Sequence, residues 1–164
     1  MNVRFIGPFP AFIHYTDDME DWQGAYATGP VVRIRPKYRD RGDEGIHLHE
    51  LEHVRQWYAG LMIGVALALA LLLVPELAEF STFWHTALIA GIGIHGLLYM
   101  LLWPYRLWAE VTAYRKQLAT YPAGTDCMWA AMALATKYRL RTSIDDARRA
   151  LSIDGYGHFQ GEQE

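Results

Sequence analysis

Two long apolar segments constrain this 164-residue chain more than any other feature of its sequence. No charged side chain occurs in residues 59–74 (AGLMIGVALALALLLV), and two histidines are the only ionisable groups in residues 83–103 (FWHTALIAGIGIHGLLYMLLW). A helix needs roughly 20 apolar residues to cross a bilayer, with about 17 as the lower limit. The second segment meets that length, and the first meets it when Trp57 and Tyr58 count as interfacial aromatics. We therefore predict an antiparallel transmembrane hairpin in a lipid bilayer.

A buried apolar hairpin in a soluble oligomer is the alternative to membrane insertion. Two such segments in so short a chain leave too little polar sequence to cover them, which favours insertion. Small residues also recur every four positions, at Gly60, Gly64 and Ala68 and again at Ala87 and Gly91. Such rows let helices approach closely in lipid. We expect the two segments to pack together, and oligomers could form through the same hairpin.

The charges around the apolar segments predict their orientation. The connection between them, residues 75–82 (PELAEFST), has two glutamates and neither lysine nor arginine. The basic residues that flank the outer ends are Arg41, Arg55, Arg106, Arg115 and Lys116. Because basic flanks normally stay in the cytoplasm, both termini should be cytoplasmic and the acidic connection should face outward. We expect an integral membrane protein, associated with the virion if the chain comes from a phage.

The composition and length limit the partners, disulfides and number of domains that this chain can have. A net charge of −3 does not favour nucleic acid as a partner. Cys127 is the only cysteine, so no internal disulfide can form. The first 20 residues contain Asp17 and Asp18 and lack a long apolar core, so they do not resemble a signal peptide. The length predicts one domain over residues 1–164, with residues 59–103 as an inserted apolar hairpin.

Residues 1–45 read as short strands separated by turns at Gly7-Pro8 and Gly29-Pro30. The strongest strand is Val31–Arg35, which is β-branched and alternates at its end. Asp43 is a candidate N-cap for a helix that continues from about residue 45 to about residue 74.

The second apolar segment leads into another helical pattern that ends near residue 121, with Pro104 as a possible kink. Two short helices follow, at residues 127–138 and 144–151, the second preceded by a capping-box-like Ser143. The predicted fold class is α+β and mainly α: short N-terminal strands, two long antiparallel helices that carry the metal ligands, and small C-terminal helices.

Residues 49–53 read His-Glu-Leu-Glu-His, the H-E-x-x-H pattern of zinc sites on helices. His49 and His53 are four residues apart, so their side chains share one helix face and can grip one ion. Glu50 is rotated by about 100° from His49 and can lie beside the ion without binding it. Glu50 is therefore a candidate general base toward a water molecule activated by zinc.

A catalytic zinc needs a third protein ligand, for which Glu110 is the candidate. His53 precedes the first apolar segment by six residues, and Glu110 follows Pro104, which ends the second, by six. If both helices emerge from the same face of the membrane, His53 and Glu110 lie at similar heights. The hairpin would then close the zinc site. A solvated carboxylate near Arg106 is the alternative for Glu110.

These motifs resemble the gluzincin branch of zinc metallopeptidases, in which H-E-x-x-H is joined by a distal glutamate. Residues 110–114 (EVTAY) also resemble the E-x-x-A-Y segment that follows H-E-x-x-H-x-x-Q in small predicted metallopeptidases of bacteria and phages. The thermolysin-like second motif, E-x-x-x-D, is absent because residue 114 is tyrosine. The resemblance covers about residues 45–58 and 105–116. It implies a zincin-like domain that binds Zn²⁺ and hydrolyses a peptide or protein substrate.

Acyl chemistry usually also needs a donor to the developing oxyanion. Tyr114, Arg115 and His158 are the candidates, and Tyr114 is favoured because it lies one turn beyond Glu110 on the same helix face. Core packing of the aromatic ring is the alternative role for Tyr114.

Three further polar residues are close to these motifs or inside the hairpin. His47 points to a different helix face from His49, which favours a helix-start or supporting role over ligation. Gln56 lies on the ligand face and could orient a neighbouring ligand. His95 is predicted to face inward and to make a packing hydrogen bond rather than to have a functional role.

Two functions follow from the sequence. The first is a membrane-embedded zinc metallopeptidase with ligands His49, His53 and Glu110 and with Glu50 as base, in which Val31–Arg35 is an edge strand that aligns an extended substrate. The second is a non-catalytic membrane or virion assembly protein that retains a zinc site. Because structural zinc sites are usually filled by four protein ligands, a fourth ligand such as His47 or His158 would favour the second.

Overall fold

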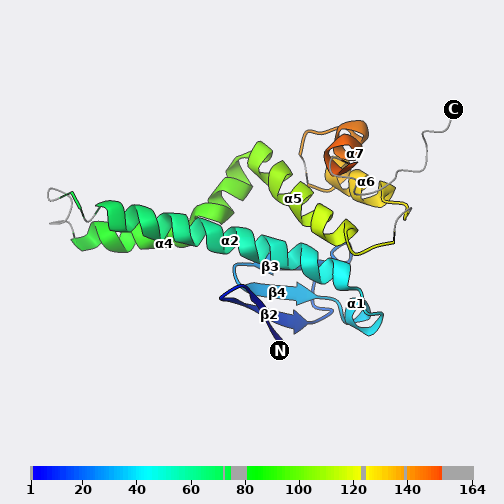
Figure 1. The fold of residues 1–164 in the computed structure, drawn as a ribbon, viewed down its shortest axis with the longest axis horizontal. Coiled ribbons are helices and arrows are strands. Elements are labelled where there is room, and N and C mark those ends of the chain that lie inside the picture. The colour runs from blue at the N-terminus through cyan, green and yellow to red at the C-terminus, as the bar shows by residue number, and fades with distance from the viewer. Residues whose placement is uncertain (1, 72, 75–80, 123–124, 139, 153–164) are drawn as a thin grey trace.

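The computed structural model describes residues 2–71, 73–74, 81–122, 125–138 and 140–152 (Figure 1). Its strands are β1 (Asn2–Ile6), β2 (Phe9–Tyr15), β3 (Ala25–Thr28) and β4 (Val31–Ile34). Its helices within the described ranges are α1 (Pro36–Asp40), α2 (Glu44–Leu71), α4 (Ser81–Leu101), α5 (Trp103–Leu118), α6 (Met128–Thr136) and α7 (Ile144–Ser152). The predicted mainly helical fold with short N-terminal strands is confirmed.

The four strands form one sheet with the order β1-β2-β4-β3. β1 pairs with β2 and β3 pairs with β4 in antiparallel fashion, whereas β2 and β4 are parallel. Val32 and Ile34 are buried and alternate with the exposed Val31 and Arg33, as expected for a strand with one covered face. The predicted strand is therefore confirmed. Its predicted edge position is wrong, because β4 lies between β2 and β3.

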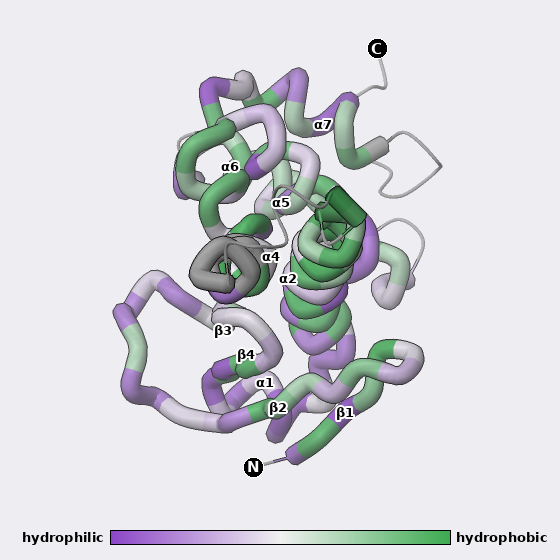
Figure 2. Tube along the Cα trace, turned by 90° about the vertical axis from the view of Figure 1, so that its left-hand side faces the viewer, coloured by the Kyte–Doolittle hydropathy of each residue, from purple (hydrophilic) through white to green (hydrophobic). Residues whose placement is uncertain are grey.

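The helix α2 is the central element of the molecule. It begins where predicted, because Oδ1 of Asp43 accepts a hydrogen bond of 3.2 Å from the backbone N–H of Ile46. The sheet packs on one side of its first half, where Ile46 and Val54 join a cluster with Ile13 and Val32. The C-terminal helices lie on the opposite side of α2 from the sheet (Figures 1 and 2).

The second half of α2 packs against α4 in antiparallel orientation (Figure 1). Gly60 faces His95, and further along the pair Gly64 faces Gly91. A Cβ atom on Gly64 would lie 2.0 Å from Cα of Gly91, so the two backbones are in direct contact. Only glycine at both positions permits this distance, which confirms the close packing expected from the rows of small residues.

The second long helix of the prediction is broken in two. Leu102 has extended backbone angles (φ −111°, ψ 99°), and α5 begins with Pro104 in its first turn. Nε of Arg106 donates to the carbonyl of Tyr99 at 2.7 Å, and its Nη2 donates to that of Met100 at 2.8 Å. These bonds satisfy carbonyl groups at the end of α4. As a result α5 returns toward the first half of α2 (Figure 1). Glu110 on α5 thereby reaches His49 and His53 on α2.

One helix among the described residues, α2, is long and apolar enough to cross a membrane by length and composition. The apolar portion of α4 that can be assessed, Gly91–Leu101, is shorter. The pair of transmembrane helices therefore stays a prediction. The acidic connection is largely outside the described residues, which resume at Ser81, and His158 is also outside them.

The two C-terminal helices pack on α5 through a second apolar cluster. Its largest fully buried members are Leu134, Leu140 and Leu151. Both helices had been predicted, and the cap of α7 is confirmed because Oγ of Ser143 accepts a bond of 3.0 Å from the backbone N–H of Asp146. This cluster holds α5 from the side opposite α2. The short helix α1 had not been predicted.

Candidate metal centre

His49 and His53 of α2 and Glu110 of α5 come together at the contact between these helices. The two Nε2 atoms are 3.3 Å apart, and the carboxylate oxygens of Glu110 lie 3.7 Å from His49 and 3.6 Å from His53. Tetrahedral zinc with metal–ligand distances of about 2.0–2.2 Å separates its ligand atoms by about 3.3–3.6 Å. The spacing of the three side chains therefore fits one such ion.

The packing of α5 on α2 explains how Glu110 reaches the two histidines. Ala109 and Ala113 are fully buried beside it, and their small side chains let the two backbones approach. Glu110 is 1% exposed, so the predicted alternative of a solvated carboxylate is wrong. Arg106 does not neutralise Glu110, because its guanidinium binds the end of α4 instead. A buried carboxylate needs a compensating positive charge.

Gln56 fixes the orientation of the His53 ring. Its Nε2 donates to the carbonyl of Ala109 at 3.1 Å and to Oγ1 of Thr112 at 2.8 Å. Its Oε1 therefore faces Nδ1 of His53, 3.1 Å away, and must accept the proton there. This tautomer leaves the Nε2 lone pair of His53 free toward Glu110. Gln56 thus orients a neighbour, as its place on the ligand face had suggested.

His49 is held in the neutral form that metal ligation requires. Burial lowers its pKa well below the ordinary value for histidine, and the nearby charge of His53 acts in the same direction. Gln117 approaches the ring and partly opposes this shift, although Nδ1 of His49 has no partner with hydrogen-bond geometry in the described part of the chain.

Glu50 lies beside the three residues and is also buried, with 5% of its surface exposed. Burial raises the pKa of its carboxyl group well above the usual range, and the charge of Glu110 raises it further. Oε2 of Glu50 and Oε2 of Glu110 have no hydrogen-bond partner among the residues that the structure describes. Unpartnered buried polar atoms are rare. Two of them beside a His-His-Glu cluster fit a cation with an accompanying water molecule.

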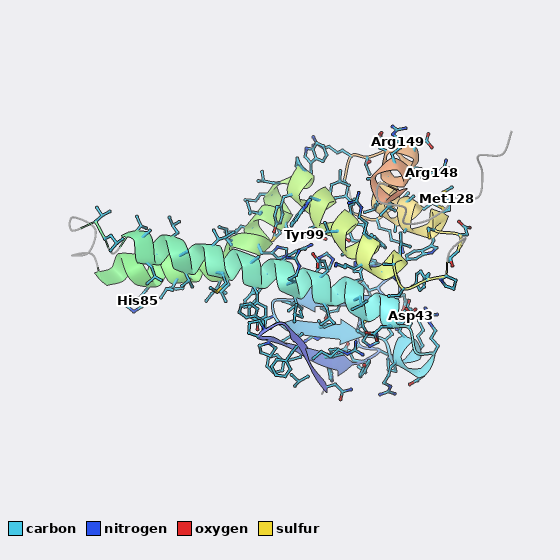
Figure 3. All side chains as sticks on the ribbon, in the orientation of Figure 1. Asp43, His85, Tyr99, Met128, Arg148 and Arg149 are labelled. Atoms are coloured by element: carbon cyan, nitrogen blue, oxygen red, sulfur yellow. The ribbon has the colours of Figure 1, made fainter. Side chains whose placement is uncertain are left out.

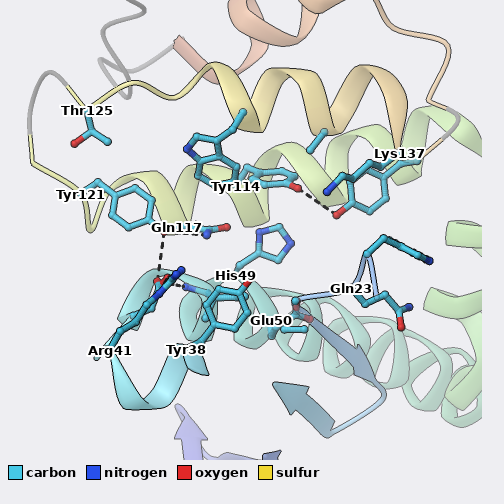
Figure 4. A pocket seen from close by; sticks show the side chains of 18 residues that line it. Gln23, Tyr38, Arg41, His49, Glu50, Tyr114, Gln117, Tyr121, Thr125 and Lys137 are labelled. Atoms are coloured by element: carbon cyan, nitrogen blue, oxygen red, sulfur yellow. Dashed lines mark hydrogen bonds and ion pairs between the residues drawn. The ribbon is translucent and has the colours of Figure 1, made fainter. Parts of the chain in front are cut away.

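A cleft of about 530 Å³ opens beside this cluster (Figure 4). His49 and Glu50 line it, whereas His53 and Glu110 lie behind them. Six aromatic rings contribute to the walls: Trp22, Tyr38, Tyr114, Tyr121, Trp129 and Tyr138. None of the lining residues comes from the described part of residues 59–103. The accessible side of the cluster therefore faces away from the apolar hairpin.

Tyr114 and Tyr138 both line the cleft, and Tyr114 packs against His49. The ring of Tyr114 is 4.5 Å from the His49 ring, and its hydroxyl is 3.2 Å from that of Tyr138. Burial raises the pKa of both phenols, so both remain donors at neutral pH. Of the other predicted oxyanion donors, Arg115 binds the carbonyl of Ala150 on α7, and His158 is outside the described residues.

His47 and His95 have roles separate from the cluster. Nδ1 of His47 bonds the carbonyl of Asp43 at 2.8 Å, and its Nε2 bonds the hydroxyl of Tyr15 at 2.9 Å. His47 therefore supports the start of α2 and does not reach the cluster. Nδ1 of His95 bonds the hydroxyl of Tyr105 at 2.7 Å, which is the packing hydrogen bond that had been predicted.

Three residues of the site had not been recognised in the sequence. Gln117 follows Glu110 by seven residues, so the helical period could have identified it as part of the same face. Tyr138 and Tyr99 reach the site through tertiary contacts, and no local sequence pattern identifies them as part of it. The hydroxyl of Tyr99 donates a short hydrogen bond to Oε1 of Glu110.

Comparison of the chain with protein-family models, with curated proteins and with solved structures found no match.

Proposed function

We propose that this protein is a membrane-anchored zinc metallopeptidase. The observation that carries the proposal is the convergence of His49, His53 and Glu110 at ligand spacing, with Glu50 unpaired beside them in an open cleft. Two histidines and one glutamate form a ligand set used by catalytic zinc, which keeps one position open. His47 is bound elsewhere, so the described residues offer no support for a closed, four-ligand structural site.

Each residue of the proposed site has a separate role in hydrolysis. Zinc would supply a Lewis acid that activates a water molecule and polarises the substrate carbonyl. Glu50 takes the proton of the attacking water and passes it to the leaving amine nitrogen. Tyr114 donates its hydroxyl proton in a hydrogen bond to the developing oxyanion. Gln56 keeps Nε2 of His53 available as a ligand.

The position of the cleft suggests the class of substrate. Because no described hairpin residue lines it, the substrate reaches Glu50 from the aqueous side as an extended peptide segment. β4 cannot align that segment, since both of its edges are paired. Among the described strands β3 lies at the edge of the sheet, and its Ala25 lines the cleft. We therefore assign substrate alignment by strand addition to β3.

The hairpin anchors the enzyme in a bilayer. The support is the exposed apolar surface of α2 and α4, where Ile63 is 61% exposed and Leu101 is 76% exposed. The cleft and both termini are then on the cytoplasmic side.

The metal is tested by elemental analysis of the purified protein. We expect about one equivalent of zinc. Two histidines and a carboxylate also suit iron(II), so stoichiometric iron in place of zinc would contradict the proposal.

Catalysis is tested with Glu50→Gln, which keeps the size of the side chain and removes the base. Zinc content should stay constant, while hydrolysis of a mixed peptide library, read by mass spectrometry, should fall by about 10²–10⁴-fold. Glu52→Gln is the matched control, because Glu52 is also buried on α2 but is paired with Arg55. Equal cleavage by wild type and Glu50→Gln would exclude Glu50 as the base.

Topology is tested in a Cys127→Ser background with single cysteines that replace Lys37 or Leu73, both exposed. In sealed vesicles a membrane-impermeant maleimide should label them from opposite sides. A monodisperse monomer in buffer without detergent would contradict the anchor.

A further inference from the structure

Glu110 receives its hydrogen bond from a different helix. The hydroxyl of Tyr99, on α4, donates to Oε1 of Glu110, while Oε2 has no partner among the residues described. Figure 3 shows Tyr99 near the junction of α4, α5 and α2, far from His85 toward the other end of α4. The two oxygens of this carboxylate are therefore not equivalent. Oε1 is held by a phenol and lies 3.6 Å from Nε2 of His53, whereas Oε2 lies 3.7 Å from Nε2 of His49 and accepts no hydrogen bond from a described residue.

The ring of Tyr99 is fixed from several sides. The guanidinium of Arg106 lies over it, 5.2 Å from the ring centroid, and also binds the backbone carbonyl of Tyr99. The ring of His53 is 6.2 Å away at a steep angle. Arg106 thus links the end of α4, the Tyr99 ring and the start of α5. A phenol anchored in this way holds its hydroxyl group in one place and loses little conformational entropy when it binds Glu110.

We propose that Tyr99 is the positioning residue that makes Glu110 a one-oxygen ligand through Oε2. The inference rests on the proposed zinc site. A hydrogen bond to Oε1 orients the carboxylate and leaves Oε2 to the ion, as partners behind metal ligands commonly do. It also makes the apolar hairpin part of the metal site, because the orienting group comes from α4 and the ligand from α5.

The test measures zinc affinity by competition with a chromophoric chelator. Tyr99→Phe should weaken binding by about 10–100-fold, the usual effect of removing such a partner. Tyr105→Phe is the matched control, because it removes a neighbouring half-buried phenol that binds His95 and not Glu110. Its zinc affinity should equal that of wild type. Tyr99→Gln, which restores a donor, should recover part of the loss and guards against a folding defect in Tyr99→Phe.

A second experiment asks whether Tyr99 acts on zinc binding by orienting Glu110 or only by stabilising the fold. In a Glu110→Ala background, adding Tyr99→Phe should cause no further loss of zinc affinity, because its target carboxylate is gone. A loss that persists in that background would overturn the assignment. Equal affinities of Tyr99→Phe and wild type would overturn it as well and leave the peptidase proposal intact. A wild-type protein that binds no zinc would overturn the metal site and this inference together.

Discussion

The two halves of α2 have opposite relations to their surroundings. In residues 44–58 the polar side chains are inside: His49, Glu50 and Gln56 are buried between the sheet and α5. In residues 59–71 the order is reversed: only Gly60, Gly64 and Ala68 are buried, and large apolar side chains such as Ile63 and Leu67 are exposed. One unbroken helix therefore buries polar side chains in its first half and small residues in its second.

The reversal is what the proposed function predicts if the two halves lie in different solvents. Water favours burial of large apolar groups and exposure of charges, except at sites where polar groups are held for function. Lipid makes exposure of leucine favourable and leaves close packing of small residues to join helices. Under the proposal, the first half would hold the metal site outside the bilayer and the second would lie within it. Four substitutions test this contrast between the two halves of α2.

The largest effect is expected at the buried histidines. His53→Ala removes a ligand and should lower zinc affinity by more than the roughly 100-fold upper range seen for supporting residues. His14→Ala, on the exposed side of β2, is the matched control and should leave the affinity unchanged. Isothermal titration with zinc measures both. Similar affinities of the two variants would mean that the buried polar half is not a metal site.

Leu67→Lys tests the apolar half, since Leu67 is 57% exposed on α2. A lysine at the centre of a membrane helix costs about 2.5–3.5 kcal/mol, so the fraction that cofractionates with membranes should drop. Ile144→Lys, on the exposed face of α7, should change stability by no more than about 0.5 kcal/mol. Unchanged membrane association of Leu67→Lys would argue that this surface meets water or another protein.

Gln56→Ala tests the role of Gln56, which lies near the boundary between the two halves of α2. It removes the acceptor for Nδ1 of His53, and zinc affinity should fall by about 10–100-fold. Gln56→Glu keeps an acceptor at this position and should retain more affinity than Gln56→Ala. The reverse order, measured by chelator competition, would contradict the assigned tautomer of His53.

The smallest effect is expected for alanine substitutions at two glycines of α4, which should change the stability of the hairpin in opposite directions. Gly91→Ala places Cβ 2.9 Å from Cα of Gly64 and should destabilise the hairpin by about 1–3 kcal/mol. Gly96→Ala meets no atom within 4 Å and should be neutral or stabilising by up to about 1 kcal/mol, because alanine favours helix. Unfolding in detergent, followed by circular dichroism, compares them. Equal stabilities would indicate that the two helices do not stay in contact.

Local patterns predicted much of this structure. The strand at Val31–Ile34, the start of α2 after Asp43 and the cap of α7 at Ser143 each follow from a few neighbouring residues. The approach of Glu110 to His53 could be predicted because the two residues lie at equal distances in sequence from the outer ends of the two apolar segments, and a helix has a fixed rise per residue.

The features that escaped prediction depend on distant neighbours. Alternation in β4 indicates which side chains are buried but not which strands lie beside it, so its interior position could not be read from the sequence. Tyr99 and Tyr138 contribute hydroxyl groups to the site across tertiary contacts. The extended backbone at Leu102 turned a long helix into two and set the direction of α5.

The continuity of α2 has a consequence for where a membrane-bound substrate can be cut. Glu50 precedes the predicted start of the anchor at Ala59 by nine residues, a distance of about 14 Å along an uninterrupted helix. α2 is continuous over this stretch, so a Glu50 carboxylate that acts as the proposed base would stay at that height above the bilayer. A polypeptide tethered in the same membrane would then have to extend about four residues from the lipid before its backbone reached Glu50. Under the proposed function, cleavage of such a polypeptide would be confined to bonds beyond that height.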